Sequence, residues 1–146
     1  MSFKFIYHKS LDELHVGCES PRAYFVPFSC EKAAIKGNRA QSDRFLSLCG
    51  DWNFSLYPSV NEAPDFLSPA FTTVGMEKIE VPRSWQTYTE RDYDIPNYTN
   101  KNYPFPIDPP HVPDMNPCGL YVRDVLIPEC KTEGKRVYIN FEGVDS

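Results

Sequence analysis

The residues of this chain that could do chemistry are numerous, but their spacing matches no catalytic pattern. Its 20 Asp and Glu residues include no pair that spacing alone identifies as the acid–base couple of a glycosidase. The sequence has no G-x-S-x-G nucleophile elbow, no Gly-rich phosphate loop and no H-E-x-x-H motif. His15 and Cys18 have the spacing of a metal-ligand pair, but zinc sites need a second pair and none supports them. The residues alone therefore define no catalytic constellation.

The five cysteines are expected to be buried free thiols. Their number is odd, their spacings are wide and no C-x-x-C pair occurs, which argues against a disulfide framework and against a zinc site. Free cysteine commonly behaves as a small buried hydrophobe. The residues concerned are Cys18, Cys30, Cys49, Cys118 and Cys130.

One Pro-rich segment has the sequence "IPNYTNKNYPFPIDPPHVPDMNPCG". Any functional side chain in this segment must be held in place by an ordered loop rather than by a helix or a strand. The segment holds seven of the 14 prolines, and proline is excluded from helix interiors and central strands. Asp108 directly precedes Pro109, where a carboxylate usually forms a turn. His111 lies between prolines and is expected to be exposed or hydrogen-bonded rather than catalytic. Proline restricts the unfolded chain, so a long loop of this kind can hold one shape.

The composition of the chain predicts a mostly β domain and excludes several classes of protein. A length of 146 residues allows one domain with a real core, and abundant proline, Phe and Tyr favour short strands and ordered loops. A net charge of −5 argues against a nucleic-acid partner. No apolar stretch approaches the roughly 20 residues of a membrane span, and the first residues do not form a signal peptide. We expect a cytoplasmic protein.

The first half of the chain contains an arm and the first β region. Residues 1–42 lack a steady period, and "SPRAYFVPFS" is typical of an extended arm laid over another surface. A short helix is expected after it, with Ser29 as its N-cap and Gly37 at its end. In "DRFLSLCGDWNFSLYPS" the β region is predicted to turn at Gly50 and Asp51, after which Trp52, Phe54 and Leu56 fall on one face.

Three further strands are predicted. "MEKIEVPRSW" is a short strand ended by Pro82, and "GLYVRDVLIPE" is a strand closed by Pro128. After a turn at "CKTEGKR", the stretch "RVYINFEGV" alternates, with Val137, Ile139 and Phe141 on one face. Alternating strands with turns between them indicate a β-sandwich. Because a complete sandwich has about eight strands, we expect an incomplete one.

Several motifs occur in an order that resembles one enzyme family. They are "DRFLSLCGDWNFSLYPS", "VPRSWQ", the Pro-rich segment and "RVYINFEGVDS", with "SPRAYFVPFS" before them. Together they resemble the N-terminal sugar-binding domain of the β-galactosidases of glycoside hydrolase family 2, over about residues 20–146. Related β-glucuronidases and β-mannosidases share L-x-G-x-W-x-F and V-P-x-x-W in looser form. The Pro-rich segment is characteristic of the β-galactosidase branch.

The resemblance implies an all-β fold, a jelly-roll-like β-sandwich that is incomplete here. Residues 1–42 would be an extended arm and residues 43–146 a partial sugar-binding domain without its (β/α)8 catalytic barrel. The Pro-rich loop would reach the mouth of that barrel. There Asn100, in "YTN", would contact the galactosyl unit through its amide, and Lys101 through its backbone. Asn100 could instead simply stabilise a turn, as Asn commonly does.

The resemblance also implies the activity of the longer enzyme. That activity is hydrolysis of terminal β-galactosides such as lactose, with retention, by a pair of glutamates in the barrel. These glutamates and the ligands of Mg²⁺ and Na⁺ lie outside this chain, so we expect the chain alone to be inactive and to hold no cofactor. Its partners would be the β-galactoside substrate, the other domains and, by analogy, further subunits of a tetramer bridged by the arm.

Aromatic residues near the loop are expected to pack rather than bind sugar. Trp52 is predicted to lie in the core and Trp85 in core or interdomain packing. Three others, Tyr98, Tyr103 and Phe105, would attach the loop to the barrel.

Two other classes of function remain open at this stage. The chain could be a free-standing carbohydrate-binding module, or a structural domain whose Pro-rich loop meets a protein partner.

Overall fold

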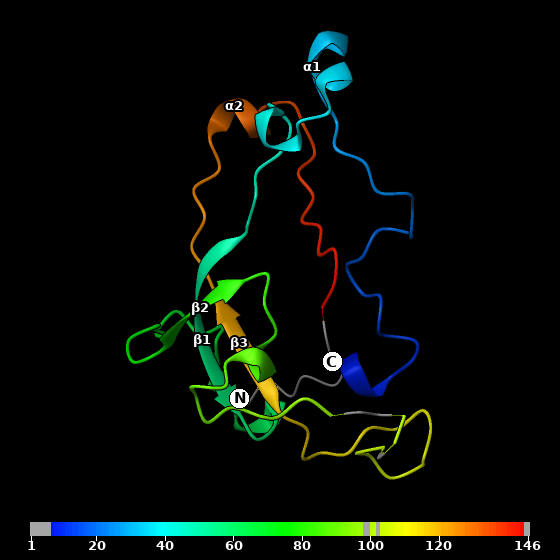
Figure 1. Ribbon diagram of the computed structural model, residues 1–146, viewed down its shortest axis with the longest axis vertical. Coiled ribbons are helices and arrows are strands. Elements are labelled where there is room, and N and C mark those ends of the chain that lie inside the picture. Colours follow the sequence, from blue (N-terminus) through cyan, green and yellow to red (C-terminus); the bar gives the residue numbers. More distant parts are fainter. Residues whose placement is uncertain (1–6, 98–99, 102, 145–146) are drawn as a thin grey trace. The chain divides into compact units, whose positions relative to one another are not determined.

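The computed structural model describes residues 7–97, 100–101 and 103–144 (Figure 1). The chain divides into two compact units. One, the sheet unit, comprises Met1–Ser20 and Gly50–Arg123. The other, the helical unit, comprises Pro21–Cys49 and Asp124–Ser146. Both units are therefore built from two separate stretches of chain.

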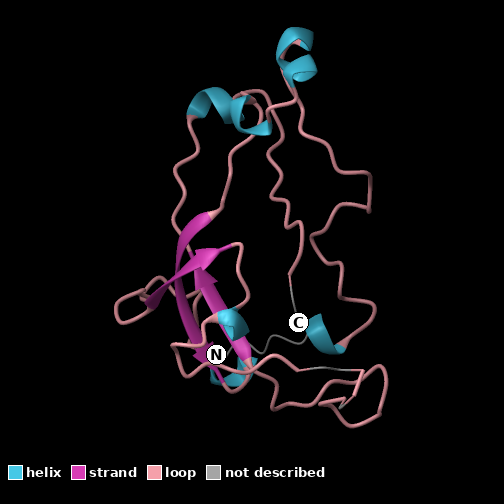
Figure 2. Ribbon diagram, viewed as in Figure 1, coloured by secondary structure: helices cyan, strands magenta, loops and turns pink. Residues whose placement is uncertain are grey.

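The sheet unit contains an antiparallel sheet of three strands in the order β2-β1-β3 (Figure 2). Strand β1 covers Gly50–Tyr57, β2 covers Glu77–Val81 and β3 covers Cys118–Val122. Residues directly opposite each other in a sheet point to the same face. The register pairs Trp52 with Ile79 and Phe54 with Tyr121, so these side chains share one face of the sheet.

The core of the sheet unit forms on that face around Phe54. Phe54 and Ile79 are completely buried, and Tyr88 is nearly so. The ring centroid of Phe54 lies 4.8 Å from that of Tyr121 and 5.1 Å from that of Tyr93, both edge-on. Trp52 and Leu56 also pack against this cluster, which confirms the predicted shared face of Trp52, Phe54 and Leu56. Aromatic pairs of this geometry add to the free energy gained by burial.

Gly119 of β3 makes room for a tryptophan over the sheet. A Cβ atom at Gly119 would lie 2.3 Å from Cζ3 of Trp85 and 2.9 Å from Cε2 of Phe54. Trp85 begins the short 3-10 helix η4, Trp85–Thr87, which directly follows β2. The Trp85 indole therefore lies directly against the backbone of β3. It can come this close only because residue 119 is a glycine.

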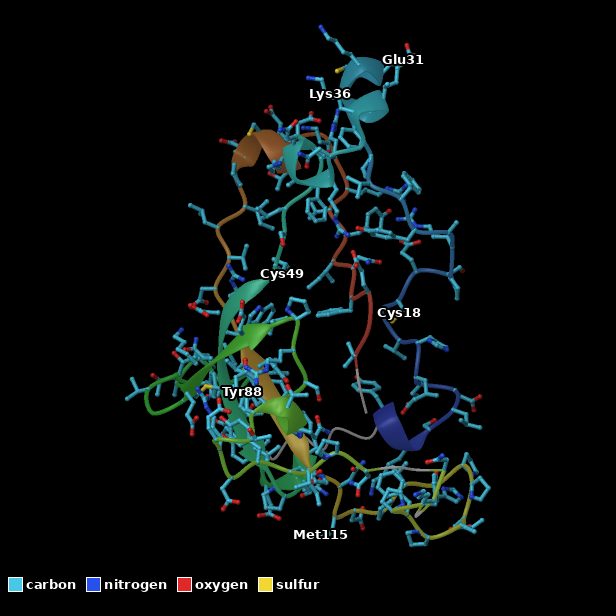
Figure 3. The ribbon with its side chains drawn as sticks, viewed as in Figure 1. Cys18, Glu31, Lys36, Cys49, Tyr88 and Met115 are labelled. Atoms are coloured by element: carbon cyan, nitrogen blue, oxygen red, sulfur yellow. The ribbon has the colours of Figure 1, made fainter. Side chains whose placement is uncertain are left out.

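Tyr88 closes part of the outer edge of β2. Its hydroxyl accepts a hydrogen bond from the backbone N–H of Glu80 at 2.8 Å and donates one to the Glu80 carbonyl at 3.2 Å. The guanidinium carbon of Arg83 lies 3.6 Å from the Tyr88 ring centroid. Figure 3 marks Tyr88 beside the sheet. Unpaired edge groups invite pairing with another chain, and the phenol satisfies both groups at this position.

The helical unit is held by polar and cation–π contacts. It contains α1 (Glu31–Lys36), the 3-10 turn η2 (Arg39–Gln41) and α2 (Glu129–Thr132). A guanidinium nitrogen of Arg39 lies 2.6 Å from a carboxylate oxygen of Glu142, and its carbon lies 4.8 Å from the Phe45 ring centroid. The Lys131 ammonium donates to the carbonyl oxygens of Asp43 and Phe45.

The predicted short helix is confirmed as α1, but its predicted N-cap is wrong. Gly37 ends the helix in the left-handed conformation, with φ 66°. The N-cap is Cys30 rather than Ser29, because the Ser29 N–H donates to the Asp43 carboxylate at 3.2 Å and the helix starts two residues later. The two remaining 3-10 turns are η1 (Tyr7–Lys9) and η3 (Val60–Glu62).

Several predicted strand boundaries are also wrong. Gly50 and Asp51 belong to β1 instead of forming a turn, because Gly50 pairs with Val81. The strand ended by Pro82 is confirmed as β2, whereas β3 ends at Val122, well before Pro128. The turn expected at "CKTEGKR" is present at Glu133 and Gly134, where the Lys135 N–H donates to the Thr132 carbonyl, but it directly follows the unpredicted helix α2.

The stretch "RVYINFEGV" is not a strand within the described part of the chain. Val137, Ile139 and Phe141 are all more than half exposed. Alternation makes a strand only where a neighbouring strand accepts its hydrogen bonds, and the described sheet contains only β1, β2 and β3. The fold is thus mostly β with a small antiparallel sheet.

The expectation of buried cysteines is wrong, although all five thiols are free. Cys118, in β3, is half-buried, and burial raises the pKa of its thiol. The other four are exposed and lie outside the core around Phe54, in connecting segments or, for Cys130, in α2: Cys18, Cys30, Cys49 and Cys130. None of the helices in residues 7–97, 100–101 and 103–144 is long and apolar enough to cross a membrane.

Candidate functional site

The Pro-rich loop, residues 95–117, connects the aromatic core to β3. Asn100 and Lys101 lie in a turn of this loop and are exposed. Tyr98, which we predicted to attach the loop to a barrel, lies outside the described residues. The structure therefore places both predicted substrate-binding residues on the surface, where their amide, ammonium and backbone groups can meet another molecule.

The ordered contacts of the Pro-rich loop are largely internal. The His111 N–H donates to the Asp108 carbonyl at 2.8 Å, which confirms that Asp108 begins a turn at the paired prolines. The ring centroids of Tyr103 and Phe105 lie 6.0 Å apart. His111 is exposed, as predicted. The loop is folded on itself, with Tyr103 exposed rather than packed against the sheet.

One ion pair links the Pro-rich loop to the beginning of the chain. The Lys9 ammonium, at the end of η1, donates to a carboxylate oxygen of Asp114. Figure 1 shows η1, in dark blue, beside the yellow part of the loop, and Figure 3 labels the neighbouring Met115. No sequence pattern indicated this pair, since the two residues are 105 positions apart.

Trp85 packs in the core and carries a buried polar atom. Its ring centroid lies 5.9 Å from that of Phe54 and 6.5 Å from that of Tyr121, so the prediction of packing is confirmed. Its indole Nε1 is buried and has no hydrogen-bond partner in the described part of the chain. A buried N–H without an acceptor costs free energy, and an acceptor supplied by another segment or by water would remove that cost.

A polar cluster borders the core next to a shallow depression of about 310 Å³. A carboxylate oxygen of Glu77 accepts hydrogen bonds from Arg91 at 2.7 Å and from the Tyr93 hydroxyl at 2.8 Å. Burial raises the pKa of Tyr93, despite an opposing hydrogen bond from Arg91. Because these groups satisfy one another, the cluster fixes the loop start at Tyr93 and offers no free acid–base pair.

The described residues hold no group of three or more His, Cys, Asp or Glu side chains that could bind a metal ion. His15 and Cys18 are linked only through the backbone, since the Cys18 N–H donates to the His15 carbonyl at 3.0 Å.

The sheet, its aromatic face and the Pro-rich loop belong to a known domain. The sequence profile described as "Glycosyl hydrolases family 2, sugar binding domain" matches residues 45–146. This match covers all three strands, the Pro-rich loop and most of the core. The chain belongs to glycosyl hydrolase family 2 through this sugar-binding domain.

Several curated relatives of the chain within the family are β-galactosidases. The chain is 43% identical over 141 residues to the β-galactosidase of Actinobacillus pleuropneumoniae, covering 96% of the chain and 13% of that protein. It is 34% identical to the β-galactosidase of Priestia megaterium, covering 85% of the chain and 12% of that protein. For the β-galactosidase of Staphylococcus xylosus the identity is 31%, over 96% of the chain and 13% of that protein. The chain thus spans about an eighth of the length of these relatives.

Proposed function

We propose that this chain is the amino-terminal part of a β-galactosidase that hydrolyses terminal non-reducing β-D-galactose residues with retention. The 43% identity to the β-galactosidase of Actinobacillus pleuropneumoniae over 96% of the chain, together with the family match over residues 45–146, carries the proposal. Residues 1–42 act as an extended arm, and residues 43–146 form part of a jelly-roll β-sandwich that the longer protein completes. Its contribution to catalysis is one wall of the substrate pocket.

Asn100 and Lys101 are the residues proposed to meet the substrate. Their exposed turn supports this role, because a sugar can approach it without displacing core side chains. The Asn100 amide both donates and accepts hydrogen bonds, which suits adjacent sugar hydroxyls. Lys101 contributes through its backbone. The catalytic glutamates, and the ligands for Mg²⁺ and Na⁺, come from the rest of the longer enzyme, so this chain alone is inactive.

The test of Asn100 uses a full-length β-galactosidase that carries these residues. Replacing Asn100 with Ala removes a hydrogen bond to the sugar, and such bonds contribute about 0.5–1.5 kcal/mol, or roughly two- to tenfold in kcat/KM. Steady-state kinetics with a chromogenic β-galactoside measures the change. Asn97→Ala is the matched control, since Asn97 is also exposed on the loop and its amide donates to the Ile95 carbonyl at 3.4 Å. Equal kcat/KM in Asn100→Ala, Asn97→Ala and the unmodified enzyme would contradict the proposed role.

The proposed inactivity of this chain is tested with the same substrate. The chain is assayed alone and mixed with a β-galactosidase that lacks its own N-terminal arm. We expect no hydrolysis by the chain alone and hydrolysis in the mixture if the arm completes the partner enzyme. Hydrolysis by the chain alone would mean that these 146 residues contain a catalytic pair.

A further inference from the structure

The Pro-rich loop gains little support from burial. Three of its aliphatic side chains stay in solvent, since Ile95 is 71% exposed, Ile107 90% and Met115 67%, whereas Phe105 and Val112 are half-buried. Its backbone bonds between Pro106 and His111 connect loop residues to one another. A loop with few buried apolar contacts opens locally at low free-energy cost. A single side-chain contact from outside can therefore shift its conformational equilibrium measurably.

The arm supplies such a contact from an ordered turn. Lys9 ends η1, and successive turns follow it, in which the Glu13 N–H donates to the Ser10 carbonyl and the Val16 N–H to the Glu13 carbonyl. The Lys9 side chain is 39% exposed and that of Asp114 74%. Both residues belong to the sheet unit, so the ion pair joins two segments of one compact unit that are far apart in the sequence.

We propose that Lys9, by pairing with Asp114, is a positioning residue that holds the Pro-rich loop in its substrate-facing shape. This proposal rests on the proposed role of Asn100 in the same loop. The arm then acts on substrate affinity within its own subunit, through one ion pair. The equilibrium concerned is that between the substrate-facing shape of the loop and its locally opened forms. Because the ion pair is exposed, it shifts this equilibrium by about two- to fivefold, and by less at high salt.

Limited proteolysis tests whether the Lys9–Asp114 pair holds the Pro-rich loop, and it needs no activity measurement. Lys101 is exposed in the loop and offers trypsin a cleavage site within it. In the whole chain, Asp114→Asn and Lys9→Met are expected to speed cleavage after Lys101 by about two- to fivefold. Lys78→Met, which removes an exposed lysine of β2, is the control and leaves the rate unchanged. Lys9→Arg and the reversed pair Lys9→Asp with Asp114→Lys restore the slow rate. Equal cleavage rates in the unmodified chain and Asp114→Asn would overturn the proposal.

Kinetics of the full-length enzyme tests the consequence for substrate binding. Lys9→Met and Asp114→Asn each raise KM for a chromogenic β-galactoside by about two- to fivefold at unchanged kcat, and the double variant raises it no further. If Asn100→Ala raises KM but Lys9→Met does not, the positioning role fails while the proposed function stands. If Asn100→Ala also has no effect while trypsin still distinguishes the variants, the proposed sugar contact of Asn100 fails, and the Lys9–Asp114 pair only holds the loop in shape.

Discussion

The sheet unit and the helical unit contain similar apolar side chains but keep them in different surroundings. Every buried hydrophobic side chain in the described residues belongs to the sheet unit, namely Phe54, Ile79 and Tyr88. In the helical unit Ser42 is buried, and its hydroxyl accepts a hydrogen bond from the Arg44 N–H. Three paired strands place their side chains in adjacent rows on one face of the sheet. Loops and single helical turns form no such face. A core therefore forms where strands pair.

The helical unit, in which the described residues include no buried hydrophobic side chain, is held together by contacts of charged side chains instead. Arg39 contacts Glu142 and two aromatic rings, those of Tyr24 and Phe45. The hydrogen bond from Arg39 lowers the pKa of Glu142. Such exposed contacts contribute little each and weaken with salt. The sheet unit thus depends on the packing of its core, whereas the helical unit depends on ion pairs. Each kind of interaction can be disrupted selectively.

The largest expected effect separates the two units by truncating one phenylalanine in each. Phe54→Ala removes a fully buried ring and should lower the free energy of unfolding by about 3–5 kcal/mol. Phe141→Ala, at an exposed ring, should change it by less than about 0.5 kcal/mol. Urea unfolding followed by circular dichroism, which reports on the backbone of both units, measures both. Similar losses for the two variants would show that the helical unit has a core of its own.

A smaller effect is expected from adding one methyl group. Gly119→Ala forces the new Cβ against Trp85, and overpacking of this kind costs about 1–3 kcal/mol. Gly143→Ala is the matched control in the helical unit, since its Cβ meets nothing within 4 Å. The unfolding midpoint in urea reports the difference. If both alanines were tolerated equally, the close packing of Trp85 on β3 would be wrong.

Removing the Tyr88 hydroxyl should have a similar or smaller effect. Tyr88→Phe leaves the N–H and C=O of Glu80 without their side-chain partner, at about 0.5–1.5 kcal/mol for each hydrogen bond. Tyr103→Phe, on the exposed loop, serves as the control. Amide exchange at Glu80 should become faster only in Tyr88→Phe, and unchanged protection there would count against the edge contact.

Tyr121 in the sheet unit and Glu142 in the helical unit should respond to opposite extremes of pH. Burial raises the pKa of Tyr121 above its usual 10.0. The contribution of this phenol to the free energy of unfolding is therefore complete below pH 10.0 and is lost as the pH rises through the pKa of the folded state. The pKa of Glu142 is lowered from 4.5, so its contribution is present above that pH and is lost as pH falls through the folded value. Because Glu142 is exposed, the acid effect is the smaller. NMR of the two units during both titrations checks this, and alkaline loss in the helical unit first would contradict it.

The sequence predicted the parts of the fold that local pattern determines. Alternation at Trp52, Phe54 and Leu56 correctly identified β1, and Gly37 correctly ended α1. The same alternation at Val137 and Ile139 failed, because strand formation depends on a partner that a local pattern does not contain. Register, and with it the choice between turn and strand at Gly50, is likewise a property of two segments.

The candidate site was less predictable than the sheet. Asn100 and Lys101 came from resemblance alone, and the sugar contact stays a prediction. The Lys9–Asp114 pair and the Glu77–Arg91–Tyr93 cluster join residues that no short pattern links. Charged residues at the surface have many possible partners, and only the folded chain selects among them.

The contact between Gly119 and Trp85 also limits how this domain can change in evolution. A side chain at position 119 requires a smaller residue at position 85, because the two occupy the same volume. Neither single replacement is neutral, since one creates a clash and the other leaves a void over Phe54. Within the family these two positions should therefore change together or not at all, although 34 residues of sequence separate them.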